Sequence, residues 1–127
     1  MTIQQVSIFL ENKPETLSEL TDVLAKNNIN MRALSLADAS DFGIARIIVD
    51  NPDEVAEVLK ANDYIVKSTK VIAIEIPDES GSLNKILKLL AKNGRNLEYM
   101  YGFTGKKTNT ARLGGWFLLL WTNWHNN

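Results

Sequence analysis

Residues 10–36 read LENKPETLSELTDVLAKNNINMRALSL, and this stretch decides the fold. It opens with the end of an alternating apolar segment, crosses a short polar loop and continues with leucines at helical spacing. Pro14 is expected as the first helical residue, because its missing N–H would have no partner there. Asn27 and Asn28 are expected to end the helix, because asparagine tolerates the left-handed backbone. Residues 29–39 then predict a second strand.

The rest of the first unit completes a regular pattern. Residues 3–10 alternate as a half-buried strand does, and residues 44–49 are a β-branched run typical of a third strand. A second helix begins at Pro52 and ends at an Asn-Asp pair, before a fourth strand at residues 64–70. The order strand, helix, strand, strand, helix, strand predicts an α+β, ferredoxin-like unit, in which two helices cover one face of an antiparallel sheet.

An abridged copy of the opening stretch begins at residue 71. A shift of 66 residues superposes the apolar helix positions, an identical Ala-Lys-Asn tripeptide and a strand asparagine. Amphipathic helices match at leucines by chance, but the tripeptide in register makes a true repeat the better explanation. The expected elements of the copy are a strand at 71–76, a loop at 77–81, a helix at 83–94 and a strand at 96–103. We therefore predict two domains, residues 1–70 and residues 71–127.

The loop and helix of the first unit resemble the opening of an ACT domain, a small regulatory module that commonly binds amino acids. The resemblance rests on Asn-Lys-Pro at residues 12–14, on the leucines that follow and on Asn-Asn-Ile-Asn at residues 27–30. Residues 33–38 and 41–43 are similar to a subgroup of small proteins made of two ACT domains in tandem. The resemblance covers residues 3 to about 107 and implies the ferredoxin-like fold that the strand order predicts independently.

Two loop positions depart from the family pattern. The family usually has glycine after the loop proline, where this chain has Glu15. In the second copy Gly81 matches that glycine, but Ser80 replaces the proline. The carboxylate of Glu15 suits the first turn of a helix, and it would compete there with a ligand anion.

The second unit departs from the pattern more strongly after about residue 108. A third strand, a helix and a fourth strand are expected, but residues 110–121 are a glycine- and tryptophan-rich apolar run. One alternative is a divergent third strand with a short apolar end. The other, which we favour, is a chain that left its ancestral reading frame or was truncated near Lys107. It predicts an incomplete second ACT-like domain whose apolar face is buried by the tail, by a second copy or by aggregation.

The helix start and the resemblance together predict a ligand site in each unit. Unpaired amide groups and the helix dipole favour a ligand carboxylate there. Asn30 is expected close to this loop, where its amide can bind a ligand, and Glu11 can pair with an ammonium group. The alternative is ordinary helix capping and an ordinary turn asparagine. The predicted residues are Glu11, Asn12, Pro14, Glu15, Thr16, Leu17, Asn30 and Met31, with Asp78, Ser80, Gly81, Ser82, Leu83 and Asn96 in the second unit. By resemblance, such a site often lies between two domains, so that one ligand touches both units or two chains.

Composition excludes several classes of function. The 127 residues carry a net charge of −1, so no basic surplus marks a nucleic acid as a partner. No apolar run approaches the roughly 20 residues that span a bilayer, and no membrane partner is expected. The absence of cysteine fits an intracellular, cytoplasmic protein. No cofactor or metal is expected, because His125 is the only histidine and forms neither a triad nor a metal cluster.

The sequence thus predicts a non-enzymatic regulatory protein that binds a small amino acid or related metabolite and forms a homodimer. A second hypothesis is an interaction module that has lost its ligand and associates through sheet edges and the apolar tail. A third is RNA binding, because Tyr99, Tyr101 and Phe103 alternate along one strand and would share a face. The first unit has no matching aromatic residues, which favours packing over base stacking for these rings.

Overall fold

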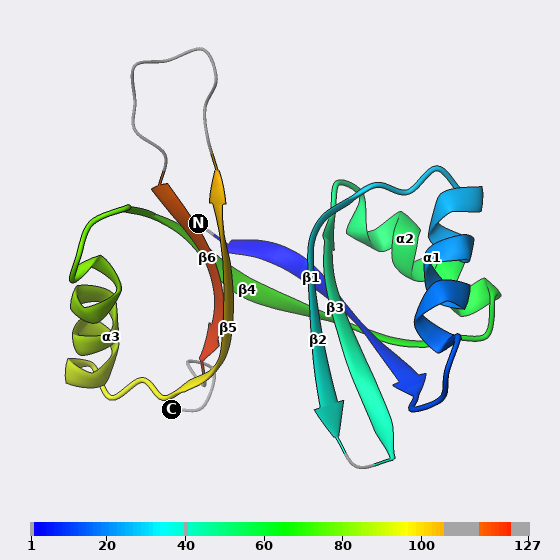
Figure 1. Cartoon of the computed structure of the whole chain (residues 1–127), viewed down its shortest axis with the longest axis horizontal. Coiled ribbons are helices and arrows are strands. Elements are labelled where there is room, and N and C mark those ends of the chain that lie inside the picture. The colour runs from blue at the N-terminus through cyan, green and yellow to red at the C-terminus, as the bar shows by residue number, and fades with distance from the viewer. Residues whose placement is uncertain (1, 40, 106–114, 123–127) are drawn as a thin grey trace. The chain divides into compact units, whose positions relative to one another are not determined.

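The computed structural model describes residues 2–39, 41–105 and 115–122. The chain divides into two compact units, residues 4–69 in one and residues 1–3 with 70–127 in the other. Figure 1 shows their helices and strands. The elements are β1 (Thr2–Glu11), α1 (Thr16–Lys26), β2 (Met31–Ala39), β3 (Phe42–Val49), α2 (Pro52–Ala61), β4 (Ile65–Pro77), α3 (Ser82–Lys92), β5 (Leu97–Gly105) and β6 (Gly115–Thr122). None of the helices in this described part has the length and apolar character that a bilayer crossing requires.

The first unit has the predicted ferredoxin-like architecture. Its strands lie in the order β2-β3-β1-β4, and β3 is antiparallel to both β1 and β2. Both α1 and α2 cover the same face of this sheet (Figure 1). The sequence pattern of alternating strands and amphipathic helices therefore predicted the fold class correctly.

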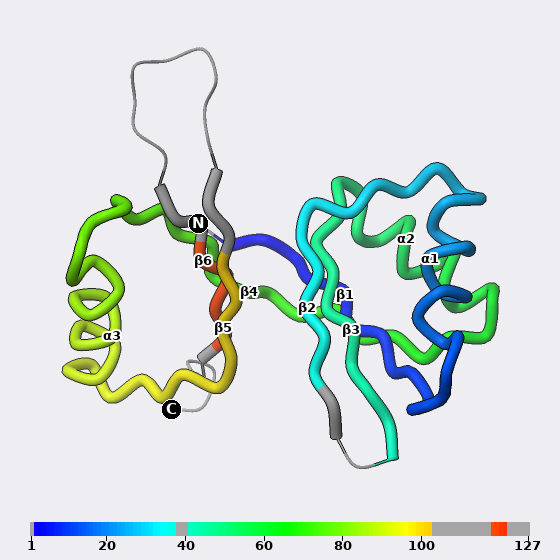
Figure 2. The backbone as a smooth tube through the Cα atoms, in the orientation of Figure 1, coloured from blue at the N-terminus to red at the C-terminus, as the bar shows by residue number. Residues whose placement is uncertain are grey.

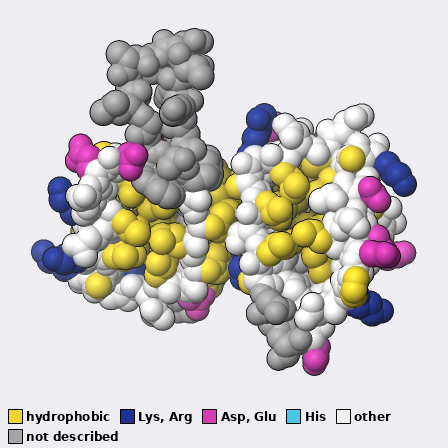
Figure 3. All heavy atoms as spheres, viewed as in Figure 1, with side chains coloured by type: hydrophobic (Ala, Val, Ile, Leu, Met, Phe, Trp, Pro, Cys, Tyr) yellow, Lys and Arg dark blue, Asp and Glu magenta, His cyan; other side chains and the backbone are white. Residues whose placement is uncertain are grey.

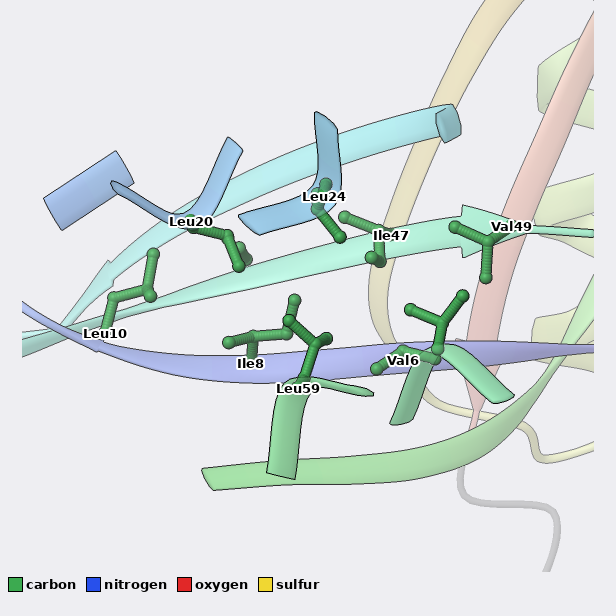
Figure 4. Close-up of a cluster of buried hydrophobic side chains, with 10 residues drawn as sticks. Val6, Ile8, Leu10, Leu20, Leu24, Ile47, Val49 and Leu59 are labelled. Carbon is green, nitrogen blue, oxygen red and sulfur yellow. The ribbon is translucent and has the colours of Figure 1, made fainter. Parts of the chain in front are cut away.

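The core of the first unit lies between this sheet and the two helices. β1 contributes Val6 and Ile8, neither of which is exposed at all, and α1 contributes Leu20 and Leu24. Leu59 of α2 points into the same cluster (Figure 4) and is also fully buried. Burial of one leucine or isoleucine side chain contributes about 1.5–3 kcal/mol, so both helices are held to the sheet chiefly by these contacts.

The three helices in the described part of the chain end in the same way. After α1, the N–H of Ile29 donates to the carbonyl of Leu24 at 2.9 Å, across Asn28 with its φ of 55°. The same bond spanning a left-handed residue recurs after α2, at Asp63, and after α3, at Gly94. This Schellman arrangement satisfies carbonyl groups that a helix end leaves without partners. The predicted ends of all three helices are confirmed.

A left-handed residue also precedes α1 and α3. Glu15 has a φ of 74° and Gly81 a φ of 88°, and each is the last residue before its helix. Pro14 therefore lies in the turn and α1 begins at Thr16, so the prediction of Pro14 as the first helical residue was wrong. The glycine expected here from the ACT resemblance has a physical reason, because only glycine adopts this conformation without a steric penalty.

We expect Glu15→Gly to raise the free energy of unfolding by about 0.5–1 kcal/mol. Glycine removes the left-handed strain of about 1–2 kcal/mol, but it loses more backbone entropy on folding. The matched change Gly81→Ala should lower the same quantity by about 1 kcal/mol. A Cβ atom at residue 81 meets no heavy atom within 4 Å, so this change tests the backbone alone. Urea unfolding measures both effects, and a less stable Glu15→Gly protein would contradict the argument.

One continuous strand joins the two units. β4 runs without interruption from Ile65 to Pro77, and the boundary between the compact units falls inside it, at residue 70. The sequence-based prediction of one strand ending at residue 70 and another beginning at residue 71 was wrong. Residues 67–72 hold neither glycine nor proline, so nothing ends the extended backbone there.

The second unit holds a three-stranded antiparallel sheet and one described helix. β6 lies between β4 and β5 and is antiparallel to both, as β3 lies between β1 and β2 in the first unit. The core consists of Ile76, Leu118 and Leu120, with further apolar side chains half-buried around them. Residues 115–122 therefore form the third strand that one of the two sequence alternatives predicts. The frame-change hypothesis concerns the coding DNA and stays a prediction.

Candidate ligand site

The loop between β1 and α1 carries an exposed ion pair. The Lys13 ammonium lies 2.7 Å from Oε2 of Glu11, and the two side chains are 69% and 73% exposed. The hydrogen bond from Lys13, reinforced by its charge, lowers the pKa of Glu11, and the carboxylate in turn raises the pKa of Lys13. Both groups are therefore charged at neutral pH. Exposed ion pairs contribute little to stability. A ligand that carries both charges can therefore take the place of Glu11 beside Lys13 and of Lys13 beside Glu11.

The loop backbone is fixed by local hydrogen bonds. The N–H of Lys13 donates to the carbonyl of Glu11 at 2.9 Å, and the hydroxyl of Thr16 donates to the carbonyl of Lys13 at 3.0 Å. The hydroxyl of Ser18 donates to the carbonyl of Glu15 at 2.9 Å. These bonds leave the first amide groups of α1 at the end of the loop, where the helix dipole is positive.

A hollow of about 440 Å³ opens beside this loop. Its volume falls within the range of about 300–1,000 Å³ that is usual for small-molecule sites. Three predicted residues line it, Glu11, Pro14 and Thr16, together with Lys13, Glu19 and the connection at residues 62–65. One cationic and several anionic side chains therefore surround a space that also has apolar walls, which suits a zwitterion. Asn12, Glu15 and Leu17, also predicted, lie outside this lining, and Leu17 packs against the core instead.

The sequence did not predict the connection between α2 and β4 as part of this site. Asn62 and Asp63 were identified as a helix end, and only the fold shows that this end lies beside the β1–α1 loop. Burial raises the pKa of Tyr64, and the carboxylates of Glu19 and Asp22 raise it further. The Tyr64 hydroxyl is therefore protonated at neutral pH and can donate. Because the folded-state pKa is raised, its stabilising contribution is complete below about pH 10 and is lost as the pH rises through the folded pKa.

Asn30 does not lie beside this loop, and that prediction was wrong. Glu11 pairs with Phe42 and Met31 pairs with Val49, so the two sites face opposite ends of β3. The seven residue-to-residue steps from Phe42 to Val49 separate those ends by about 23 Å. Figure 2 shows the reason, because the chain returns along α1 before it enters β2. One ligand in the first unit cannot reach both the loop and Asn30.

Asn30 lines a second, smaller hollow of about 210 Å³ between the end of α1 and the start of α2. The other polar residues around it are Asn27, Asn28, Asp50, Asn51 and Glu54. Asp50 is bound by both Nε and Nη2 of Arg32, at 3.1 and 2.8 Å, and this pairing lowers the pKa of Asp50. The hollow is rich in amide groups but has half the volume of the loop hollow.

A family match described as an ACT domain pair covers residues 1–110. The chain belongs to the ACT domain pair family. This confirms the resemblance seen in the loop, the first helix and the tandem repeat. Residues 111–127 lie outside the match. No protein of curated function matches the chain.

Solved structures share the ACT fold. A protein from Bacteroides thetaiotaomicron is 41% identical, with 97% of this chain and 81% of that one covered and a TM-score of 0.84. The regulatory subunit of aspartate kinase from Thermus thermophilus, in a ligand-free form, is 12% identical over 94% and 87% of the two chains, with a TM-score of 0.59. The corresponding subunit from Thermus flavus is 13% identical over 94% and 84%, with a TM-score of 0.61. At this identity the two kinase subunits show the fold alone.

In the second ACT unit, as in the first, the predicted loop residues and the predicted strand asparagine lie far apart. Pro77, beside the loop with Asp78, Ser80, Gly81, Ser82 and Leu83, pairs with Gly115, whereas Leu97, beside Asn96, pairs with Thr122. The two groups thus lie at opposite ends of β6. The loop residues are exposed except for Ser82, which is half-buried, and Asn96 is exposed.

Tyr99 and Tyr101 of β5 are partly buried within the second ACT unit. The ring of Tyr99 stacks on that of Trp121, with centroids 5.9 Å apart and planes 6° from parallel. One face of Tyr99 is therefore covered, and Tyr101 is half-buried. The side chain of Phe103 lies outside the described residues. This packing supports the interpretation of Tyr99 and Tyr101 as structural residues rather than as a base-stacking platform.

Proposed function

We propose that this ACT domain pair is a non-enzymatic regulatory protein that binds an amino acid in the loop hollow of its first unit. The observation that carries the proposal is that Lys13, Glu11 and Glu19 line the same hollow of about 440 Å³. An amino acid presents a carboxylate and an ammonium group close together, and this lining offers a partner for each. The family, whose modules commonly bind amino acids, supports the same ligand class.

The proposed pose follows from the charges. The ligand carboxylate binds the Lys13 ammonium close to the start of α1, where the helix dipole also favours an anion. The ligand ammonium binds the carboxylate of Glu11 or Glu19. The ligand side chain contacts the apolar part of the hollow, beside Pro14. Glu15 does not line the hollow, so its carboxylate leaves the anion position open.

Regulation in this proposal comes from cross-linking. A ligand in the hollow joins the β1–α1 loop, the first turn of α1 and the α2–β4 connection, which belong to different elements. It thereby stabilises the ligand-bound arrangement of the first unit over the ligand-free arrangement. A partner protein that binds these two arrangements with different affinity then responds to the ligand. The chain acts as a homodimer in this proposal. Asn30, about 23 Å away along the strands, contacts such a ligand only if a different unit or copy supplies it.

A thermal-unfolding scan against the standard amino acids, each at millimolar concentration, tests the proposal. A ligand that binds only the folded state stabilises it by about 2.7 kcal/mol at a hundredfold excess over its Kd. In a chain of this size the midpoint should rise by several degrees. Asn30→Ala should keep the shift if the loop hollow alone holds the ligand. A flat panel with a sharp transition would refute amino-acid binding and favour an interaction module, for which the exposed leucines of α3 are the supporting observation.

A further inference from the structure

The two ACT units bury equivalent positions to different degrees. With the 66-residue shift of the repeat, each apolar position of β1 and α1 has a counterpart on β4 and α3. In the first unit these positions are 0–2% exposed, whereas all of their counterparts are only partly buried. The pairs are Val6 and Ile72, Ile8 and Ile74, Leu20 and Ile86, and Leu24 and Leu90. The helix-facing side of the second sheet is therefore apolar but only partly covered by the described residues.

The first unit shows which element covers such a face. Val55 and Leu59 of α2 are buried in the same cluster as Ile8, Leu20 and Leu24. Figure 4 shows Leu59 directed at β1 from the α2 side. Among the described residues of the second unit, α3 is the only helix, and none of its side chains is buried. The open face thus corresponds to the surface that receives an amphipathic helix in the first unit.

The exposed flank of α3 carries a specific combination of side chains. Leu89 is 57% exposed, whereas its counterpart Val23 packs against the first core. Lys85 and Lys92 lie four residues before and three residues after Leu89, so all three share one side of the helix. Figure 3 shows hydrophobic side chains gathered beside α3 on the visible face of this unit. The surface therefore offers an apolar anchor point between two cations.

The charge of α3 differs from that of its repeat partner. Residues 82–92 carry three lysines and no acidic residue, and all three lysines are exposed. The counterparts of Lys85 and Lys88 in α1 are Glu19 and Asp22, so the sign is reversed at both positions. The covering helix α2, in contrast, holds three acidic residues and one lysine. A helix of the α2 type is thus complementary in charge to α3.

We infer that the face formed by α3, β4 and β6 of the second unit docks an amphipathic helix with an acidic flank, supplied by another polypeptide. Its apolar residues recur at the spacing of Val55, Ala56 and Leu59 and pack on Ile72, Ile74 and the exposed Leu89. Its carboxylates pair with the lysines of α3. Attraction of this kind speeds association and depends on salt, whereas the apolar contacts supply the affinity.

A peptide with the sequence of residues 51–63, blocked at both ends and fluorescently labelled, is a direct probe of this surface. Added to the full-length protein at low salt, it should bind saturably, as measured by fluorescence anisotropy. Binding should weaken as salt is raised, because exposed charges are screened. A second peptide with lysine at positions 53, 54 and 57 keeps the apolar spacing and reverses the charge. It should bind about tenfold or more weakly, since like charges then face each other.

Leu89→Asp should lower the affinity of the acidic peptide about tenfold or more, because it places a carboxylate at the apolar anchor and beside the incoming acidic flank. Leu34→Asp, at a comparably exposed leucine of β2, should leave the affinity unchanged. Far-UV circular dichroism should show both variants folded. Binding that Leu89→Asp leaves unaltered, or no binding at millimolar peptide, would overturn the inference. A parent dimer that Leu89→Asp converts to monomers would overturn the proposed occupant, because a second copy would then cover this face.

Discussion

Leu24→Ala should lower the free energy of unfolding of the first ACT unit by about 2–5 kcal/mol, the usual range for a buried leucine cut back to alanine. Leu24 is 2% exposed and contacts the core that both helices share. The matched change Leu90→Ala, at the same position of the repeat, should reduce stability by less than half as much. Leu90 is only partly buried, so alanine there removes less buried surface and leaves no enclosed cavity.

Two spectroscopic probes can separate the units in this experiment. All three tryptophans lie at positions 116, 121 and 124, so tryptophan fluorescence reports on the second unit. Far-UV circular dichroism reports on both units. Leu24→Ala should shift the dichroism transition in urea, and Leu90→Ala should shift the fluorescence transition by a smaller amount. Equal losses for the two variants would show that α3 is covered as fully as α1 in solution.

The sequence predicted the fold because its local patterns and its tertiary contacts agree. Leu20 and Leu24 stand at helical spacing, and both are buried. Asn28 and Asp63 follow their helices as left-handed residues, which short polar side chains tolerate. The prediction of a strand boundary failed where the local pattern favoured neither the end of a strand nor its continuation. Nothing around Val71 marks either a strand end or its continuation, and only pairing with neighbouring strands keeps β4 extended.

Only part of the lining of the candidate site could be predicted, and the reason is topological. Pro14 and Thr16, which line the loop hollow, were predicted because a loop before a helix has unpaired amide groups, which is a local property. The distance between this loop and Asn30 depends on the direction of β2 relative to β1, and no single stretch of sequence encodes it. The contribution of Tyr64 likewise follows from α2 returning its end to the β1–α1 loop.

Lys13→Met should nearly abolish stabilisation by the amino acid that the thermal scan identifies. The change removes the cation that binds the ligand carboxylate and keeps most of the side-chain length. A lost hydrogen bond to a charged group corresponds to about 1.5–3 kcal/mol, or roughly a hundredfold weaker Kd. A ligand present at a hundred times the original Kd then stabilises the fold by only about 0.4 kcal/mol, where it previously stabilised it by about 2.7 kcal/mol.

Lys26→Met is the matched control, because Lys26 is an exposed lysine in the last turn of α1 and lies outside the hollow. It should keep the full ligand-induced shift while changing the ligand-free midpoint only slightly. The Glu11–Lys13 pair is exposed, so the ligand-free Lys13→Met protein should also unfold near the parent midpoint. An undiminished shift in Lys13→Met would place the ligand elsewhere, and loss of the shift in Asn30→Ala would then move the site to the smaller hollow or to a contact between copies.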